Sequence, residues 1–248
     1  MYQKIGLKVA VSYSPNFDLP KRLKKRIKFI IIHYTGMKKE TTAIKRLQDP
    51  NSKVSSHYLI RKNGEIINLV PDLYKAWHAG VSNWKNFRFL NKDSIGIEIT
   101  NPGHQYGYKN FSSKQIFSLK KLLNFLVKKY KINNKFILGH SDISPDRKKD
   151  PGEKFPWEML ARNNLGWWHK LDHKKLKKLR GKALSAKKEK DIFTKNLYKI
   201  GYKDIKGFKY SKNIKYLTYA FQRKFRQSLV DGKIDKECLL ISKNLILQ

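Results

Sequence analysis

The chain has 248 residues, 40% of them apolar, which is enough for one domain of ordinary size and a smaller second one. No run approaches the roughly 20 apolar residues that span a bilayer, so we expect no membrane span. The formal net charge is +36, but 45 of the 55 basic residues are lysines spread along the chain, which argues against a specific nucleic-acid partner. Cys238 is the only cysteine, which excludes an intramolecular disulfide, and we expect it to be buried in a helix.

The opening segment, residues 1–22, has only a short apolar patch, which is too weak for a secretory signal. We therefore expect a cytoplasmic location, with the periplasm or the cell wall as the alternative.

Short apolar runs predict the first strands. Residues 27–33 are rich in isoleucine and nearly continuous in apolar character, typical of a strand buried on both faces, with His33 at its exit. Residues 57–61 and 66–70 predict a hairpin, whose tight turn contains Asn63-Gly64.

An alternating strand and a long helix follow. In residues 94–100 three isoleucines share one face, so that Glu98 projects from the other. Residues 112–130 carry apolar side chains at helical spacing and open with a capping box between Ser112 and Gln115. We expect this helix to cover the sheet.

Residues 136–140 predict another short buried strand, which ends on His140 as the first strand ends on His33. Strands mixed with at least two helices indicate an α/β domain with polar groups gathered at strand ends.

The chain divides into three parts. We assign residues 1–170 to the α/β domain and the lysine-rich residues 171–188 to a linker, which is partly helical. Residues 189–248 carry three apolar helical stretches with a turn at Asp231-Gly232, and so predict a small all-α C-terminal domain.

A metal site is the sharpest chemical signal. His140 and Asp150 lie at loop spacing in the segment GHSDISPDRKKDPG, and His33 ends the first strand. A lone histidine at a strand end is more often an ordinary hydrogen-bonded residue. Two imidazoles and a carboxylate together are a set that holds a catalytic Zn²⁺ and leaves a fourth position open for water or substrate. The pattern therefore favours metal-assisted hydrolysis.

Five ordered segments carry a family resemblance: IIIHYT, KVSSHYLIRKNGEI, AWHAGVSNW, DSIGIEITN and GHSDISPDRKKDPGEKFPW. Over roughly Lys28 to Trp168 the chain resembles the zinc-dependent N-acetylmuramoyl-L-alanine amidases, a group that includes the peptidoglycan recognition proteins. It is most similar to the branch that cleaves muropeptides, including 1,6-anhydro forms, and that has aspartate as third ligand. The resemblance implies a mixed β-sheet flanked by helices, a peptidoglycan or muropeptide substrate, and a monomer.

The resemblance also implies roles for residues. His33, His140 and Asp150 become the zinc ligands, Glu98 the general base, and Lys148 the cation beside the oxyanion. For Glu98 the alternative is a solvated strand carboxylate.

Two positions qualify these roles. Because Lys149 lies beside Lys148, the family motif alone decides which of the two lysines is the cation. Ser56 stands where the phage-type branch has a catalytic tyrosine, so that proton transfer is left to Glu98.

Substrate contacts are implied for Lys53, Trp77, His78 and Arg88. Arg88 lies one place from the usual arginine, and Phe89 occupies that place. Core packing is the alternative for Trp77, and solvated charge is the alternative for Lys53 and Arg88.

The C-terminal stretch resembles the small helical peptidoglycan-binding domain at Gly201-Tyr202, Ala220-Phe221-Gln222 and Val230-Asp231-Gly232. The alternative is a helical cap that only stabilises the enzyme. Two rivals to the amidase are a non-catalytic wall-binding protein of the recognition type and a nucleic-acid binder.

Overall fold

A computed structural model describes residues 9–248. The first eight residues lie outside the described part of the chain. They belong to the opening segment that we expect not to be a secretory signal. From residue 9 onward, every helix is too short or too polar to cross a bilayer.

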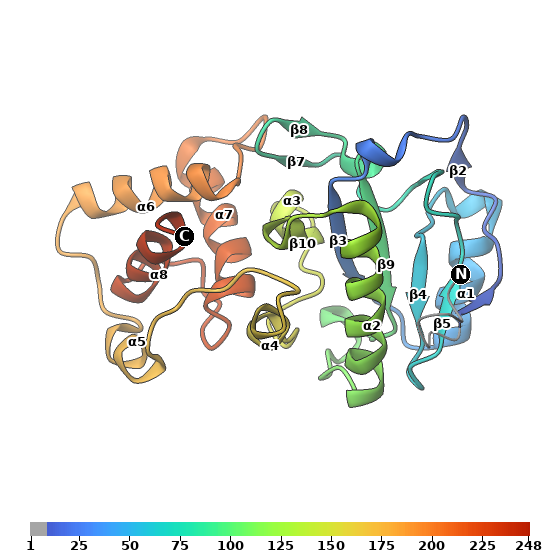
Figure 1. Ribbon diagram of the computed structural model, residues 1–248. Helices are drawn as coiled ribbons and strands as arrows, with labels where there is room; N and C mark the ends of the chain where they lie inside the picture. The colour runs from blue at the N-terminus through green and yellow to red at the C-terminus, as the bar shows by residue number, and fades with distance from the viewer. Residues whose placement is uncertain (1–8) are drawn as a thin grey trace.

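A six-stranded mixed sheet forms the centre of the molecule, in the order β1-β5-β4-β9-β3-β10 (Figure 1). Its strands are β1 (Val9–Val11), β3 (Phe29–Tyr34), β4 (Tyr58–Ile60), β5 (Ile66–Asn68), β9 (Ser94–Ile99) and β10 (Ile137–Gly139). Within the described residues of this sheet, β4 and β5 are the one antiparallel pair, and they form the hairpin predicted at Asn63-Gly64. There are also two small antiparallel ribbons. One pairs β2 (Phe17–Asp18) with β6 (Lys75–Ala76), and the other pairs β7 (Asn83–Trp84) with β8 (Phe87–Arg88).

The helices are α1 (Glu40–Gln48), α2 (Ser113–Tyr130), α3 (His140–Ile143), α4 (Trp157–Arg162), α5 (His173–Leu179), α6 (Lys187–Ile200), α7 (Tyr210–Phe225) and α8 (Lys236–Ile246). The predicted capping box is present, because the Ser112 side chain accepts from Gln115 N while the Gln115 side chain accepts from Ser112 N. The α/β architecture with a helical C-terminal part is confirmed.

The two faces of the sheet bury different partners. On β3, Ile30 and Ile32 pack with the leucines of α2, which crosses in front of β3 and β9 in Figure 1. Phe29 and Ile31 point the other way, into a cluster that includes Phe193 and other apolar residues of the C-terminal part. The α2 face and the opposite face are therefore both closed, which fits a strand of continuous apolar character.

We call α6, α7 and α8 the C-terminal helices. Their core is continuous with the sheet: residues of all three share one apolar cluster with β3 and β10. The predicted linker is partly helical, as expected, and Leu176 of α5 is buried in the same cluster. The domain boundaries at 170 and 188 stay a prediction about independent folding units.

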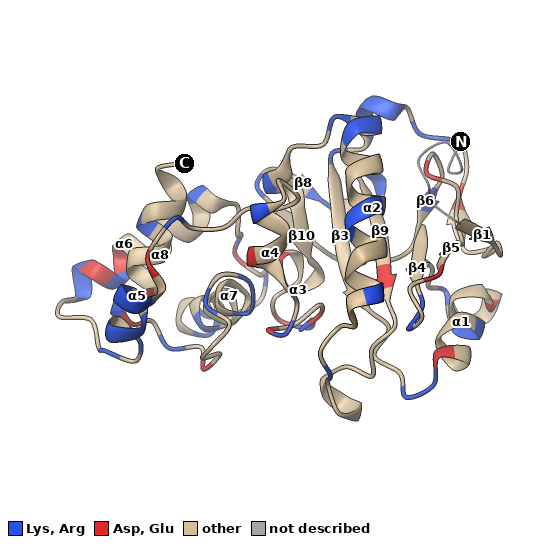
Figure 2. Cartoon of the chain, turned by 60° about the horizontal axis from the view of Figure 1, so that its bottom comes forward, with Lys and Arg blue, Asp and Glu red and all other residues tan. Residues whose placement is uncertain are grey.

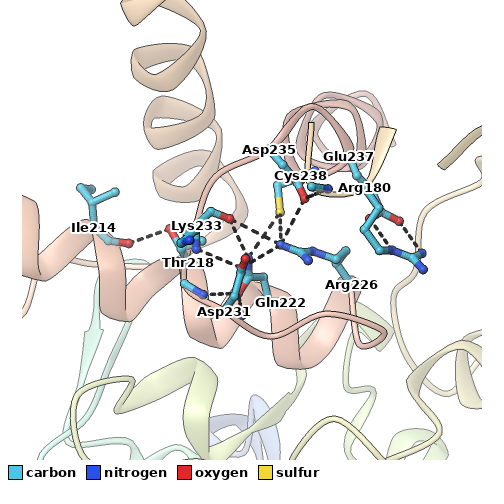
Figure 3. Close-up of polar contacts among 12 residues, drawn as sticks. Arg180, Ile214, Thr218, Gln222, Arg226, Asp231, Lys233, Asp235, Glu237 and Cys238 are labelled. Carbon is cyan, nitrogen blue, oxygen red and sulfur yellow. Dashed lines mark hydrogen bonds and ion pairs between the residues drawn. The ribbon is translucent and has the colours of Figure 1, made fainter. Parts of the chain in front are cut away.

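A buried polar cluster holds the bend between α7 and α8 (Figure 3). Arg226 is 2% exposed, and its Nη2 lies 3.3 Å from Asp231 Oδ1 and 3.4 Å from Asp235 Oδ2. Gln222 Nε2 donates to Asp231 Oδ1 at 3.0 Å, and Asp235 caps α8 by accepting from Cys238 N. These contacts fix the turn at Asp231-Gly232. Cys238 is free and buried, as predicted.

Lysine and arginine occur over the whole molecule, on α1, α2, α5 and α7 among other elements (Figure 2). This spread agrees with the sequence-based expectation that the charge does not mark a specific nucleic-acid site, which stays a prediction.

Candidate active site

Three side chains from distant parts of the sequence meet at the edge of the sheet. His33 lies near the end of β3, His140 begins α3 directly after β10, and Asp150 follows in the next loop. His33 Nδ1 lies 3.0 Å from His140 Nδ1 and 3.0 Å from Asp150 Oδ2, and the last two atoms are 3.1 Å apart. All three side chains are buried. The structure therefore brings the predicted ligand set together.

Hydrogen bonds fix which nitrogen of His33 is free. Ser94 Oγ donates to Leu90 O, so its oxygen is left to accept from His78 Nε2 at 3.2 Å. His78 Nδ1 is then an acceptor for His33 Nε2–H at 3.1 Å. His33 Nδ1 therefore carries a lone pair directed at His140 and Asp150.

The same holds for His140, whose Nε2 lies 3.2 Å from the carbonyl oxygen of Ala79. Since a carbonyl only accepts, Nε2 carries the proton and Nδ1 carries a lone pair. Two imidazole lone pairs and a carboxylate oxygen thus converge, an arrangement that is repulsive unless a cation joins them. The donor set, two histidines and one aspartate with partners bonded behind the rings, fits Zn²⁺.

The protonation states agree with a cation site. Burial, with His140 nearby, lowers the pKa of His33 to about 4, so its ring is neutral at pH 7. Burial alone would raise the pKa of the Asp150 carboxyl, but His140 and His33 beside it hold that pKa far below its usual range. The site therefore offers a neutral His33 imidazole and an ionised Asp150 carboxylate at pH 7.

Glu98 stands beside this set, opposite His33 in the parallel register of β9 and β3. Its neighbours on β9, Ile97 and Ile99, pack under α2, so Glu98 projects from the opposite face, as predicted. Its Oε2 is buried without a hydrogen-bond partner among residues 9–248. Burial and the nearby Asp150 raise the pKa of Glu98 to about 8, while Lys148 opposes the shift.

A cleft of about 660 Å³ opens onto these groups. His33, Glu98, His140 and Asp150 lie in its wall with the cations Arg46, Arg147, Lys148 and Lys149. Lys148 acts on the pKa of both His33 and Glu98, so its charge lies near both of them. Lys149 is exposed.

The four predicted substrate residues lie at different places. Trp77 and His78 line the cleft. His78 is only 9% exposed, and both of its ring nitrogens form hydrogen bonds, one with His33 and one with Ser94. Lys53 is exposed in a left-handed conformation after a short turn at residues 50–52. Arg88 is exposed and lines a neighbouring groove of about 1120 Å³, which shares Arg147 with the cleft.

His57 is excluded as a further ligand. Its Nδ1 accepts from Gly96 N at 3.0 Å and its Nε2 lies 3.0 Å from Tyr74 O, so both nitrogens are engaged in the core. Burial and Arg22 lower the pKa of His57 to about 3. Ser56 donates to Tyr58 O and is fully buried, so it does not replace the phage-type tyrosine.

Sequence reasoning missed Ser94 and Gly96, which set the position of His78. A Cβ on Gly96 would overlap the His78 ring, so only glycine lets the ring lie against β9. Glycine inside an alternating strand was the available signal. The pair formed by Tyr34 and His104 on the cleft wall, with Oη and Nδ1 2.8 Å apart, had no such signal.

Comparisons with known proteins agree with this geometry. Residues 23–153 match the N-acetylmuramoyl-L-alanine amidase family. The chain is 35% identical to N-acetylmuramoyl-L-alanine amidase AmiD of Escherichia coli over 233 residues, 89% of this chain and 83% of that protein. It is 46% identical to 1,6-anhydro-N-acetylmuramyl-L-alanine amidase AmpD of Haemophilus influenzae over 107 residues, 43% of this chain and 56% of AmpD.

A solved structure covers both parts of the molecule. The complex of Escherichia coli AmiD with anhydro-N-acetylmuramic acid-L-Ala-D-gamma-Glu-L-Lys is similar over 93% of this chain and 92% of that chain, with a TM-score of 0.78 and 32% identity.

The sheet, the cleft and a His/His/Asp group that could hold a metal ion define a hydrolase of the amidase class. The chain belongs to the N-acetylmuramoyl-L-alanine amidase family and is an amidase, as the resemblance predicted. The alternative of a non-catalytic wall-binding protein is not supported.

Proposed function

We propose that the chain is a zinc enzyme that hydrolyses the amide bond between N-acetylmuramic acid and L-alanine, in 1,6-anhydro-muropeptides or in peptidoglycan, for cell-wall turnover or recycling. The observation that carries the proposal is the convergence of three lone pairs beside the unpartnered Glu98 Oε2 in one cleft. AmiD, which shares the fold over nearly the whole chain, has been solved with an anhydro-muropeptide of this kind.

His33 Nδ1, His140 Nδ1 and Asp150 Oδ2 would hold the zinc. When bound there, zinc supplies Lewis-acid activation of the amide carbonyl and a lower pKa for water. A pKa of about 8 lets Glu98 exchange its proton near neutral pH, so that its ionised form takes a proton from water and its protonated form gives one to the leaving nitrogen. Glu98 Oε2 takes the proton of the attacking water and passes it to the nitrogen of the leaving L-alanine.

Lys148 is proposed to offset the negative charge that develops on the carbonyl oxygen. Both lysines line the cleft, but the effect of Lys148 on the pKa of His33 and of Glu98 supports this role over the exposed Lys149.

Substrate contacts follow from position. Trp77 offers an apolar wall to the sugar or peptide and is held by its Nε1 donating to Asp18 at 2.6 Å. Lys53 and Arg88 are proposed to meet stem-peptide carboxylates at the ends of an extended substrate. For His78 the contacts favour orientation of His33 over contact with substrate.

The test is mass spectrometry of products after incubation of zinc-loaded and chelator-stripped protein with anhydro-muropeptides and, separately, with intact sacculi. We expect free stem peptides only with zinc, and the faster substrate identifies the physiological one. Release of no stem peptide from either substrate by the zinc-loaded protein would contradict the proposal.

The monomeric state and the cytoplasmic location expected from the sequence stay predictions. Light scattering of the purified protein and immunodetection in fractionated cells would test them.

A further inference from the structure

Asp142, two residues after the ligand His140, is the centre of a fully buried polar cluster. Its Oδ2 accepts from Gly139 N at 2.8 Å and from Lys224 Nζ at 3.0 Å, and its Oδ1 accepts from Tyr202 Oη at 2.8 Å. Asp142 is 1% exposed, Lys224 2% and Tyr202 0%. The carboxylate is therefore satisfied by these donors without help from bulk water.

Two of these donors come from the C-terminal part of the chain. Lys224 lies near the end of α7, and Tyr202 directly follows α6 and the bend at Gly201. Lys224 Nζ also donates to Ile137 O at 3.1 Å and lies 4.5 Å from the centre of the Trp157 ring. The ammonium is thus enclosed by residues of the α/β domain although it belongs to a C-terminal helix.

A buried ammonium is costly unless it is paired, and removal of one partner leaves the other charge uncompensated. Stabilising contact between the two parts is already provided by the shared apolar cluster. The charged pair adds a fixed geometry, because each oxygen of Asp142 has its own donors.

The Asp142 cluster is connected to the metal ligand His140 through hydrogen bonds of the backbone. Asp142 holds the N–H of Gly139, and Asp150 O accepts from Ser141 N at 2.9 Å. The N–H groups of the residues before and after His140 are therefore both tied, that of Gly139 to Asp142 and that of Ser141 to the loop of the ligand Asp150. The position of His140 Nδ1 depends on the first of these ties as well as on the Ala79 carbonyl behind the ring.

We propose that Lys224 and Tyr202 are positioning residues for the metal ligand His140 and act through Asp142. The C-terminal helices are thereby part of the support of the metal centre, in addition to any affinity for the wall. The inference rests on the zinc site proposed above.

The experiment compares zinc affinity among full-length variants, measured by competition with a chromophoric chelator, together with the visible absorption of the cobalt-substituted protein. Lys224→Met removes the ammonium, and Tyr202→Phe removes one hydroxyl. Leu217→Ala is the matched control, because Leu217 is a fully buried residue of α7 in the apolar cluster. It destabilises the same helix without touching the charged pair.

We expect Lys224→Met to weaken zinc binding about tenfold or more and to shift the cobalt spectrum, as the loss of outer-shell support does in other metal sites. Tyr202→Phe should weaken binding about threefold, the effect of one hydrogen bond. The double variant Lys224→Met/Asp142→Asn should recover most of the affinity, because the amide oxygen still accepts from Gly139 N without a buried unpaired charge. Leu217→Ala should bind zinc as the wild type does.

Unchanged zinc affinity and cobalt spectra in Lys224→Met and Tyr202→Phe, with tight binding by the wild type, would overturn this inference alone. An equal loss of affinity in Leu217→Ala would also overturn it, because general destabilisation would then be the cause. A wild-type protein that takes up no zinc would overturn the metal site and this inference together.

Discussion

The two faces of the central sheet are built from the same strands and differ in what they bury. The α2 face is apolar from Ile30 and Ile32 of β3 to the isoleucines of β9. The opposite face is apolar at Phe29 and Ile31 and turns polar at His33 and Glu98, toward the end of the strands. One face is thus mainly a packing surface, and the other combines a packing surface with the candidate active site.

This difference shows how one strand serves two purposes. Alternation along β3 sends Ile30 and Ile32 to α2 and the odd-numbered residues to the C-terminal helices and the cleft. The parallel register then sets Glu98 opposite His33 without any loop between them. The proposed base and the proposed first ligand are therefore held by the backbone hydrogen bonds of the sheet, which are stiffer than loop contacts.

Among the variants that test the difference between the two faces, Glu98→Gln should have the largest effect on activity. The amide cannot accept the proton, so kcat should fall about 10²–10⁴-fold, while zinc content stays that of the wild type. Rates of stem-peptide release and metal analysis of the purified variant check both parts. Wild-type rates in the variant would remove Glu98 from the mechanism and leave the polar face with a metal site only.

The two neighbouring lysines provide a matched pair. Lys148→Ala should lower kcat about 10²–10³-fold, the usual cost of losing a group that stabilises an oxyanion. Lys149→Ala should stay within about threefold of the wild type, because an exposed cation is screened by solvent. Steady-state kinetics on one anhydro-muropeptide compare them, and the reverse order of effects would assign the role to Lys149.

Truncation on the α2 face should affect stability and leave the chemistry intact. Leu122 is fully buried under the sheet, so Leu122→Ala should lower the free energy of unfolding by about 2–5 kcal/mol. Urea unfolding measures the loss, and zinc titration of the folded variant should match the wild type. A parallel loss of zinc affinity would mean that the two faces are coupled.

The α2 side has one polar cluster of its own, at Asp72. Its carboxylate accepts from Tyr58 Oη at 2.5 Å, Lys129 Nζ at 2.7 Å and Tyr130 Oη at 2.7 Å. Burial would raise the pKa of Asp72, but these donors lower it below its ordinary value of 3.8. A depressed folded-state pKa contributes stability above about pH 4, which is lost as the pH falls through the folded-state pKa.

Asp72→Asn should therefore cost about 1.5–3 kcal/mol at pH 7 and progressively less below about pH 4, where the wild type loses the same contribution. Urea unfolding of both proteins at pH 7 and pH 3 measures the difference. An equal cost at the two pH values would show that the charge of Asp72 contributes nothing.

The sequence predicted what local periodicity encodes. Spacing within a few residues predicted the capping box of Ser112 and Gln115 and the length of α2. It also predicted that Glu98 points away from the face that α2 covers. His33, His140 and Asp150 could be proposed together because strand ends in an α/β fold gather at one edge. The family resemblance, not spacing, supplied the choice of Lys148.

Contacts between distant segments could not be predicted in the same way. Lys224 is one of many lysines, and nothing near it in sequence indicates that it pairs with Asp142, 82 residues away. Gly201-Tyr202 was interpreted as part of a wall-binding motif, which stays a prediction, and no local signal indicated that Tyr202 is fully buried against the α/β domain. His78 was assigned to substrate because its loop lines the cleft, while its hydrogen bonds run inward to His33 and Ser94.

Gly96 has a consequence for how this enzyme tolerates change. The chain of hydrogen bonds behind His33 needs the His78 ring to lie flat on β9, and that space exists only because position 96 has no Cβ. A saturation library at this codon, selected for zinc-dependent turnover, should return glycine alone. The position most intolerant of substitution would then be one that contributes no side chain to the reaction.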